Sequence, residues 1–209
     1  MSATVERIES VGPDSRARRI SFSDGSAPRT TSAAALKLLG LESGSEVEPL
    51  QLLEELAKHE PQLARDRALQ LLGYRERSRQ ELYQRLRDNG YPDNVVAAVV
   101  ARFCEVELVD DARFASAWVR SRISAGYGSR RIRRELAEKG VDDDLIAAAI
   151  EEEAVDDELS RARASLRGSA ARDSRERERL IRRLVSRGFE LRVAVEAVGP
   201  LAGHEPDGT

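Results

Sequence analysis

The fold is decided by residues 128–141, GSRRIRRELAEKGV, which contain an amphipathic helix and its end signal. Ile132 and Leu136 have the spacing of one buried helical face. Gly140 follows where a residue in the left-handed conformation ends a helix. In a Schellman motif, the residue after this glycine packs against the residue four positions before it. Val141 and Leu136 are that pair, so the sequence predicts a helix that ends at Gly140 and a second helix soon after it.

The same pattern occurs three times along the chain. Each copy has a glycine with apolar residues four and eight positions before it, and one, five and ten positions after it. The three glycines are Gly90, Gly140 and Gly188, which are 50 and 48 residues apart. A further helix is predicted upstream of each copy, over residues 64–74, 112–124 and 158–168. A unit of three helices buries little apolar surface alone, so we expect the three units to stack on one another.

The first 60 residues have a different pattern. Alternation of apolar and polar residues predicts a β-hairpin with strands over 4–9 and 18–22, and Asp24-Gly25 is a hairpin turn signal. Two short helices are predicted to follow, over residues 33–39 and 50–59. Thr31 or Ser32 is expected to cap the first helix, Gly40 to end it, and Pro61 to close the second. The intervening residues 41–49 are predicted to form a loop or a brief strand.

These patterns predict a mainly α protein. Tandem three-helix repeats form an elongated helical body, and a small N-terminal β-hairpin and helix module precedes them. The predicted domains are the N-terminal module at 1–60, the repeats at 61–109, 110–155 and 156–198, and a disordered tail at 199–209.

Composition narrows the classes of function. The chain has 209 residues with 34 Lys+Arg and 37 Asp+Glu, and its single cysteine rules out an internal disulfide or a cysteine-rich metal site. The longest apolar run, residues 95–101, is too short to cross a bilayer, and the N-terminus lacks the apolar segment of a signal peptide. We expect a soluble, cytoplasmic protein that does not bind membranes.

Residues suited to catalysis or metal binding lack partners in the sequence. His59 lies near a predicted helix end and His204 in the predicted tail, and neither has a base or metal ligand at a useful spacing. No phosphate loop, dinucleotide-binding pattern or nucleophile elbow occurs. Acids at 110–111, 142–144 and 156–157 precede predicted helices, which favours helix capping over metal binding. We therefore expect no catalysis, no metal and no cofactor.

Charge is sorted into blocks along the chain. Residues 112–134 hold seven arginines and no acid, whereas 141–160 hold nine acids and no base. Like charges four positions apart cost an isolated helix a few tenths of a kcal/mol, roughly. The arginine block therefore favours binding to a polyanion or an acidic protein groove, and an ordinary solvated face is the alternative. The candidate binding residues are these arginines and a tyrosine between two glycines beside them: Arg113, Arg120, Arg122, Tyr127, Arg130, Arg131, Arg133 and Arg134.

Three motifs together resemble the RecX family of bacterial recombination regulators. The motif residues are Arg75, Arg77, Ser78 and Glu81 in 74–86, Asp110, Asp111 and Phe114 in 109–115, and Gly128, Glu135, Lys139 and Gly140 in 128–141. The resemblance covers residues 64–155 well and the third repeat weakly. The third repeat lacks the Arg-x-Arg-Ser and Asp-Asp-x-x-Phe-Ala elements, and Glu107-Leu108 stands where a glycine-aromatic step is common in the family.

The resemblance implies a non-enzymatic regulator that binds the RecA recombinase and the RecA–single-stranded DNA filament. Members typically suppress the ATPase, strand-exchange and coprotease activities of RecA. A monomer is expected, and weak direct binding to DNA is compatible with the resemblance.

Two other classes of function remain open at this point. One is a helix-turn-helix DNA-binding regulator that places a basic helix in the major groove, although a net charge of −3 weakens this alternative. The other is a helical-repeat scaffold that binds neither DNA nor RecA.

Overall fold

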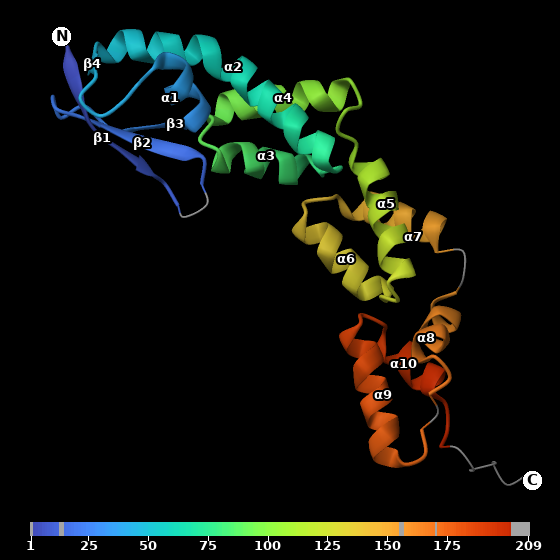
Figure 1. The fold of residues 1–209 in the computed structure, drawn as a ribbon. Coiled ribbons are helices and arrows are strands. Elements are labelled where there is room, and N and C mark those ends of the chain that lie inside the picture. Colours follow the sequence, from blue (N-terminus) through green and yellow to red (C-terminus); the bar gives the residue numbers. More distant parts are fainter. Residues whose placement is uncertain (1, 13–14, 155–156, 170, 202–209) are drawn as a thin grey trace, which may run out of the picture. The chain divides into compact units, whose positions relative to one another are not determined.

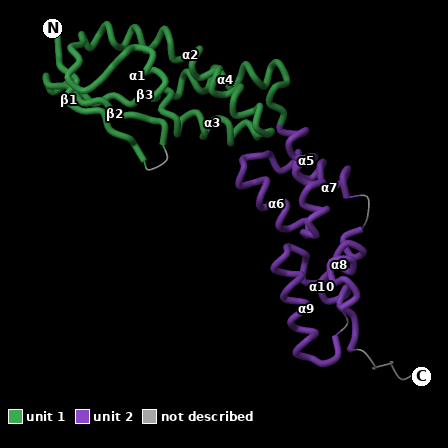
Figure 2. The backbone as a smooth tube through the Cα atoms, viewed as in Figure 1, with its two compact units in different colours: residues 1–110 green, residues 111–209 purple. Residues whose placement is uncertain are grey.

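The computed structural model describes residues 2–12, 15–154, 157–169 and 171–201 of the chain. Within these ranges the protein is mainly helical with a small N-terminal sheet, which confirms the predicted fold class (Figure 1). Contacts divide the chain into two compact units, residues 1–110 and 111–209 (Figure 2). Most of the predicted tail, residues 202–209 with His204, lies outside the described residues.

The first unit opens with an antiparallel sheet that is larger than the predicted hairpin. Its strands are β1 (Ala3–Ser10), β2 (Ala17–Phe22), β3 (Arg29–Ser32) and β4 (Glu46–Val47), in the order β3-β2-β1-β4. The predicted antiparallel pairing of β1 and β2 is confirmed, and the turn at Asp24-Gly25 leads from β2 into β3, a strand that was not predicted. The strand β3, with the sequence RTTS, has no apolar alternation and is held by backbone pairing to β2, for example between Thr31 and Arg18.

Helix α1 (Ala33–Leu39) has the predicted bounds and end signals. The Ser32 hydroxyl accepts a hydrogen bond from the Ala35 N–H, and Gly40 has a φ of 62°.

Helix α2 (Pro49–Tyr74) differs from prediction because it continues through Pro61. Leu52 and Leu56 pack in the core of the sheet module, whereas Ala64 and Ala68 pack in the core of the first repeat. The buried stripe of α2 therefore runs across the proline. Packing on both sides offsets the hydrogen bond that proline cannot donate.

The remaining helices form the three predicted three-helix groups, the first of which uses the C-terminal half of α2. The first group adds α3 (Arg79–Asp88) and α4 (Asp93–Glu105), the second has α5 (Asp111–Ser124), α6 (Ser129–Glu138) and α7 (Asp143–Glu153), and the third has α8 (Glu158–Leu166), α9 (Ser174–Ser186) and α10 (Leu191–Val198). Each group has its own cluster of buried apolar residues, as expected for tandem repeats.

The predicted helix ends are confirmed in all three repeats. Gly90, Gly140 and Gly188 have φ values of 92°, 71° and 92°. The next residue in each repeat donates its N–H to the carbonyl of the leucine four positions before the glycine. These bonds join Tyr91 to Leu86 (3.4 Å), Val141 to Leu136 (3.1 Å) and Phe189 to Leu184 (3.2 Å). They are the Schellman bonds, and they set the sharp turn into the third helix of each repeat.

The acids that precede helices serve helix termini to different extents. The Asp157 carboxylate accepts a hydrogen bond from the Ser160 N–H at 2.9 Å and caps α8. Asp111 and Asp143 lie in the first turns of their helices, where a negative charge is favourable. Asp142 occupies the N-cap position of α7 without a side-chain cap bond, and Asp156 lies outside the described residues.

The start of α6 is capped by the third repeat and not by a side chain of its own segment. The N–H groups of Gly128 and Arg130 donate to the carbonyls of Arg187 and Gly188, each at 3.0 Å. The Ser129 N–H donates to a Glu158 carboxylate oxygen at 2.8 Å. These bonds satisfy donors that every helix start leaves open. The second and third repeats are thereby joined through backbone groups.

This contact leaves no space for a side chain at either glycine. A Cβ atom on Gly128 would lie 2.4 Å from the Gly188 carbonyl carbon, and one on Gly188 would lie 2.6 Å from the Arg131 nitrogen. Gly188 is therefore required twice, for its left-handed backbone and for the close approach.

Gly188→Ala and Gly168→Ala separate these two requirements. Gly168 also has a positive φ, 74°, but has open space around it. We expect Gly168→Ala to lower the free energy of unfolding by about 1 kcal/mol, and Gly188→Ala to lower it by a further ~1–3 kcal/mol through overpacking. Urea unfolding followed by fluorescence of Trp118, the single tryptophan, measures both in the second unit. Equal losses would contradict the proposed role of the backbone contact.

Candidate interaction surface

A stack of aromatic and cationic side chains organises the arginine block. The Lys139 ammonium lies 4.5 Å from the centroid of the Trp118 ring, and the Arg122 guanidinium lies 4.2 Å from the same centroid. The Arg131 guanidinium lies 4.1 Å from the centroid of the Tyr127 ring, and Arg122 is 5.9 Å from it. Such cation–π contacts are favourable when the ring and the cation are partly removed from water. The stack fixes side chains from α5 and α6 against each other.

Glu135 joins the members of this stack. Its carboxylate accepts hydrogen bonds from Arg122 Nε (2.6 Å), Arg131 Nε (2.7 Å) and Trp118 Nε1 (3.1 Å). The Glu135 side chain is only 14% exposed. Burial raises the pKa of Glu135, but the hydrogen bonds from Arg131, Arg122 and Trp118 outweigh burial, so its pKa lies below the ordinary value. The carboxylate is therefore held in its charged form at neutral pH.

The structure divides the candidate arginines into two groups. Arg122 and Arg131 are half-buried and bound to Glu135, and Arg120 forms an ion pair with Glu153 on α7. Tyr127 is half-buried and the Arg131 guanidinium is stacked on its ring, so the ring is not an open platform. Arg113 is exposed on α5. Arg131 and Glu135 are an i,i+4 pair on α6, but the pairings of Arg120 and Arg122 join different helices, which residue spacing along one helix does not reveal.

The second group consists of Arg130, Arg133 and Arg134, which are exposed on α6. Ile132 and Leu136 are fully buried, so these three cations lie away from the core as predicted. Arg134 has only a loose ion pair, 3.7 Å from Glu138 on the same helix.

Arg130 and Arg134 border a cavity of about 340 Å³ whose other wall belongs to the third repeat. Arg131 lies on the same side of the cavity, and Val185, Ser186 and Gly188 line the opposite side. Sequence reasoning missed this contribution. Glycines at 128 and 188 are compatible with a close approach, but their spacing does not show that they meet.

Most motif residues of the first repeat are structural. The Ser78 hydroxyl caps α3 by accepting the Glu81 N–H at 3.1 Å. The Glu81 carboxylate pairs with both Arg75 and Arg77. Arg77 is 8% exposed, and its pKa is lowered by burial and then by the neighbouring Arg75. These residues fix the turn between α2 and α3.

The second-repeat motif residues have similar roles. Phe114 is buried in the core, and its ring centroid lies 5.7 Å from that of Trp118. Lys139 stacks on the same Trp118 ring. Gly128 contacts the third repeat, and Gly140 ends α6. Asp110 and Asp111 lie at the start of α5.

Metal-ligand clusters and membrane-spanning helices are two further features of interest. Within the described ranges, no group of three or more His, Cys, Asp or Glu side chains is placed to hold a metal ion. None of the helices that the structure describes is both long and apolar enough to span a membrane.

Glu135→Gln tests the stack. The pKa of Glu135 is lower in the folded than in the unfolded chain. Its charge therefore stabilises the fold at pH values above the pKa of the unfolded chain, which is about 4.3. That contribution is lost as pH falls through the folded pKa. We expect the variant to lose about 1–3 kcal/mol of unfolding free energy at pH 7, and the difference from the wild type to narrow below about pH 4.

The control is Glu138→Gln on the same helix. The Glu138 side chain is 68% exposed, so its change should cost less than about 0.5 kcal/mol. Urea midpoints measured at pH 7 and pH 3 provide both comparisons. A pH-independent gap between Glu135→Gln and the wild type would show that the carboxylate charge contributes nothing.

Comparisons with known proteins agree with this architecture. A family model described as the second three-helix domain of RecX matches residues 110–150, and the model of the first three-helix domain matches residues 64–103. The regulatory protein RecX of Mycolicibacterium smegmatis is 39% identical over 154 residues, which cover 68% of this chain and 81% of that protein. The RecX protein of Chromohalobacter salexigens is 41% identical over 128 residues, which cover 60% of this chain and 84% of that protein.

Two solved structures share the fold. A crystal structure of a regulatory protein RecX matches with a TM-score of 0.59 at 20% identity and covers 94% of this chain and 98% of its own. RecX from Lactobacillus salivarius matches with a TM-score of 0.61 at 20% identity, over 68% of this chain and 96% of its own. With two family models on consecutive repeats and relatives near 40% identity over most of their length, the chain belongs to the RecX family of regulatory proteins.

Proposed function

We propose that this protein regulates the RecA recombinase by binding RecA and the RecA–single-stranded DNA filament. In this proposal it lowers the ATPase, strand-exchange and coprotease activities of RecA by binding, and it catalyses no reaction itself. Family membership supports a regulatory role. The observation that supports the binding site is the group of three exposed arginines on α6, Arg130, Arg133 and Arg134.

The α6 arginines are suited to binding because the fold does not need them. They lie opposite the buried Ile132 and Leu136, and the third repeat extends the surface beside them. Guanidinium groups recognise phosphate and carboxylate groups through paired hydrogen bonds. A filament offers both, as the phosphates of DNA and the acidic side chains of RecA.

The alternative of a helix-turn-helix DNA reader is less compatible with the structure. In that class the N-terminal residues of the recognition helix contact the base edges in the major groove. In α6 those positions are occupied, because Gly128, Ser129 and Arg130 donate their N–H groups to the third repeat. The free face of α6 is its flank, which favours contact with a charged surface over reading of bases.

The triple variant Arg130→Glu, Arg133→Glu and Arg134→Glu tests the proposed site. All three side chains are exposed, and an acid at position 130 suits the positive end of the helix dipole, so the fold should be retained. We expect the wild-type protein to inhibit the ATPase of RecA on single-stranded DNA and the triple variant to lose at least tenfold in potency. Loss of phosphate contacts also makes filament binding less dependent on salt.

A charge-matched control carries Lys58→Glu, Arg65→Glu and Arg102→Glu, which are exposed on α2 and α4. It has the same net charge change as the triple variant, so nonspecific electrostatics affect both equally. A melting curve of each variant confirms folding. Equal inhibition by the triple variant and the wild type at two salt concentrations would place the contact elsewhere. No effect of the wild-type protein on RecA, with binding to bare duplex DNA, would favour the alternative.

A further inference from the structure

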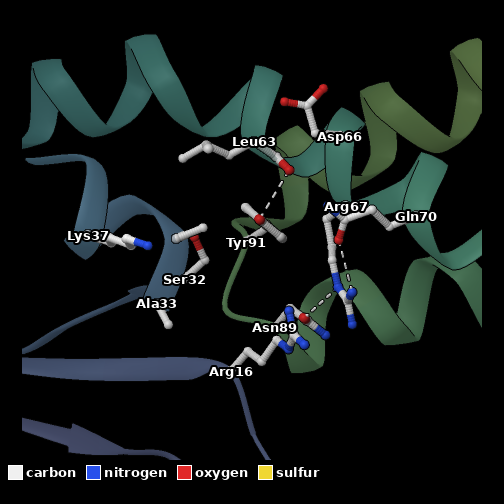
Figure 3. Close-up of a pocket in the computed structure, with 11 residues that line it drawn as sticks. Arg16, Ser32, Ala33, Lys37, Leu63, Asp66, Arg67, Gln70, Asn89 and Tyr91 are labelled. Atoms are coloured by element: carbon white, nitrogen blue, oxygen red, sulfur yellow. Dashed lines mark hydrogen bonds between the residues drawn. The ribbon is translucent and has the colours of Figure 1, made fainter.

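A second cationic site lies in the first unit, apart from the arginine block. A cavity of about 400 Å³ opens between the start of β2, α1, α2 and the turn after α3 (Figure 3). Cavities of this size hold small ligands in many proteins. Its apolar part includes Ala33, Leu63 and the buried Tyr91, and its charged part includes Arg16, Lys37 and Arg67. Three elements far apart in the sequence thus bring cations to one concave surface.

Among the residues that the structure describes, no carboxylate forms an ion pair with the three cations of this cavity. Arg67 donates Nε to Asn89 Oδ1 at 3.1 Å and Nη1 to Gln70 Oε1 at 3.3 Å, both of which are neutral acceptors. The side chains of Arg16 and Lys37 are exposed and have no described hydrogen bond or ion pair. In Figure 3 Lys37 extends into the cavity from α1, while Arg16 and Arg67 approach Asn89.

The described hydrogen bonds of the acids near the cavity are made with neutral groups and not with its cations. Asp66 is the one carboxylate among the described lining residues, and it accepts a hydrogen bond from Gln62 Nε2 at 2.8 Å on its own helix. Glu60 does not line the cavity; it is buried and accepts a hydrogen bond from the Thr31 hydroxyl at 2.6 Å, and burial raises its pKa. The pKa of Arg67 is lowered by burial and then by repulsion from Arg16. An anion in the cavity would relieve that repulsion.

The cavity is held in shape by contacts that do not involve a ligand. Asn89 is 8% exposed and donates Nδ2 to the Arg85 carbonyl, which leaves Oδ1 to orient the Arg67 guanidinium. The Tyr91 hydroxyl donates to the Leu63 carbonyl at 3.1 Å. Gly90 lies so close to β3 that a Cβ atom would be 2.3 Å from the Thr31 carbonyl oxygen. Arg67 is therefore positioned in advance, which lowers the cost of binding.

We propose that this cavity binds a phosphate group, with Arg67 as the oriented guanidinium and Arg16 and Lys37 as the cations that close over it. Arginine matches phosphate oxygens with paired donors, and lysine adds a mobile charge. The phosphate belongs either to a free nucleotide or to a nucleic-acid strand, since both present the same group. This site is independent of the α6 arginines and of any effect on RecA.

Isothermal titration with sodium pyrophosphate and with ATP, at low ionic strength, tests the cavity in the full chain. We expect saturable binding with one site per chain. The double variant Arg16→Gln and Lys37→Gln removes two exposed cations and should keep the fold, while weakening binding at least tenfold. Arg67→Gln should weaken it further and is accompanied by a melting curve, because Arg67 also holds Asn89.

The control variant is Lys58→Gln with Arg65→Gln, which has the same charge change on the exposed part of α2. It should bind pyrophosphate like the wild type. A fluorescent oligothymidylate, titrated with the same variants, distinguishes the two sources of phosphate. If binding of the oligothymidylate depends on Arg16 and Lys37, the ligand is a nucleic-acid strand. If only the binding of pyrophosphate and ATP depends on these residues, the ligand is a nucleotide. Absence of saturable pyrophosphate and ATP binding, or equal loss in the control variant, would overturn the proposal.

Discussion

A left-handed glycine at the end of the middle helix is the constraint on which the rest of each repeat depends. A side chain at this position would oppose the positive φ that ends the helix and turns the chain into the next one. In the first and third repeats the same glycine is also where another segment approaches, β3 at Gly90 and the start of α6 at Gly188. One residue type thus sets both the turn within a repeat and the contact between layers.

The sequence predicted the local parts of this structure and not the distant ones. The glycine pattern and α1 follow from spacing and caps that lie within a few residues of each other. The strand β3 has no apolar alternation, so only its pairing to β2 reveals it. Pro61 was expected to end a helix because proline lacks a backbone N–H, which can be read from the residue itself. The packing that allows α2 to continue past Pro61 involves residues far away in the sequence. In the candidate site, the local helical spacing correctly predicted that Arg130, Arg133 and Arg134 lie away from the buried Ile132 and Leu136.

The partners of Arg120 and Arg122 could not be predicted from the sequence, whereas Arg131 pairs with Glu135 at the ordinary i,i+4 spacing of one helix. Glu153 is 33 residues from Arg120, and Glu135 is 13 residues from Arg122. An arginine-rich segment therefore contains two kinds of residue. Some pair with half-buried carboxylates, and others are exposed on α6, where we propose that they bind an external partner. The first repeat uses the same arrangement, with Glu81 between Arg75 and Arg77. Most residues of the family motifs therefore serve to hold the helices together.

The capping of α6 by the third repeat has a consequence for synthesis of the chain. While the ribosome is still making residues beyond the second repeat, the first N–H groups of α6 have only water as a partner. Their hydrogen bonds to the Arg187 and Gly188 carbonyls form after the third repeat has emerged and folded. A nascent chain that stops before Gly188 therefore carries a second repeat with an open helix start. The start of α6 is therefore completed only after the chain has been made at least as far as Gly188.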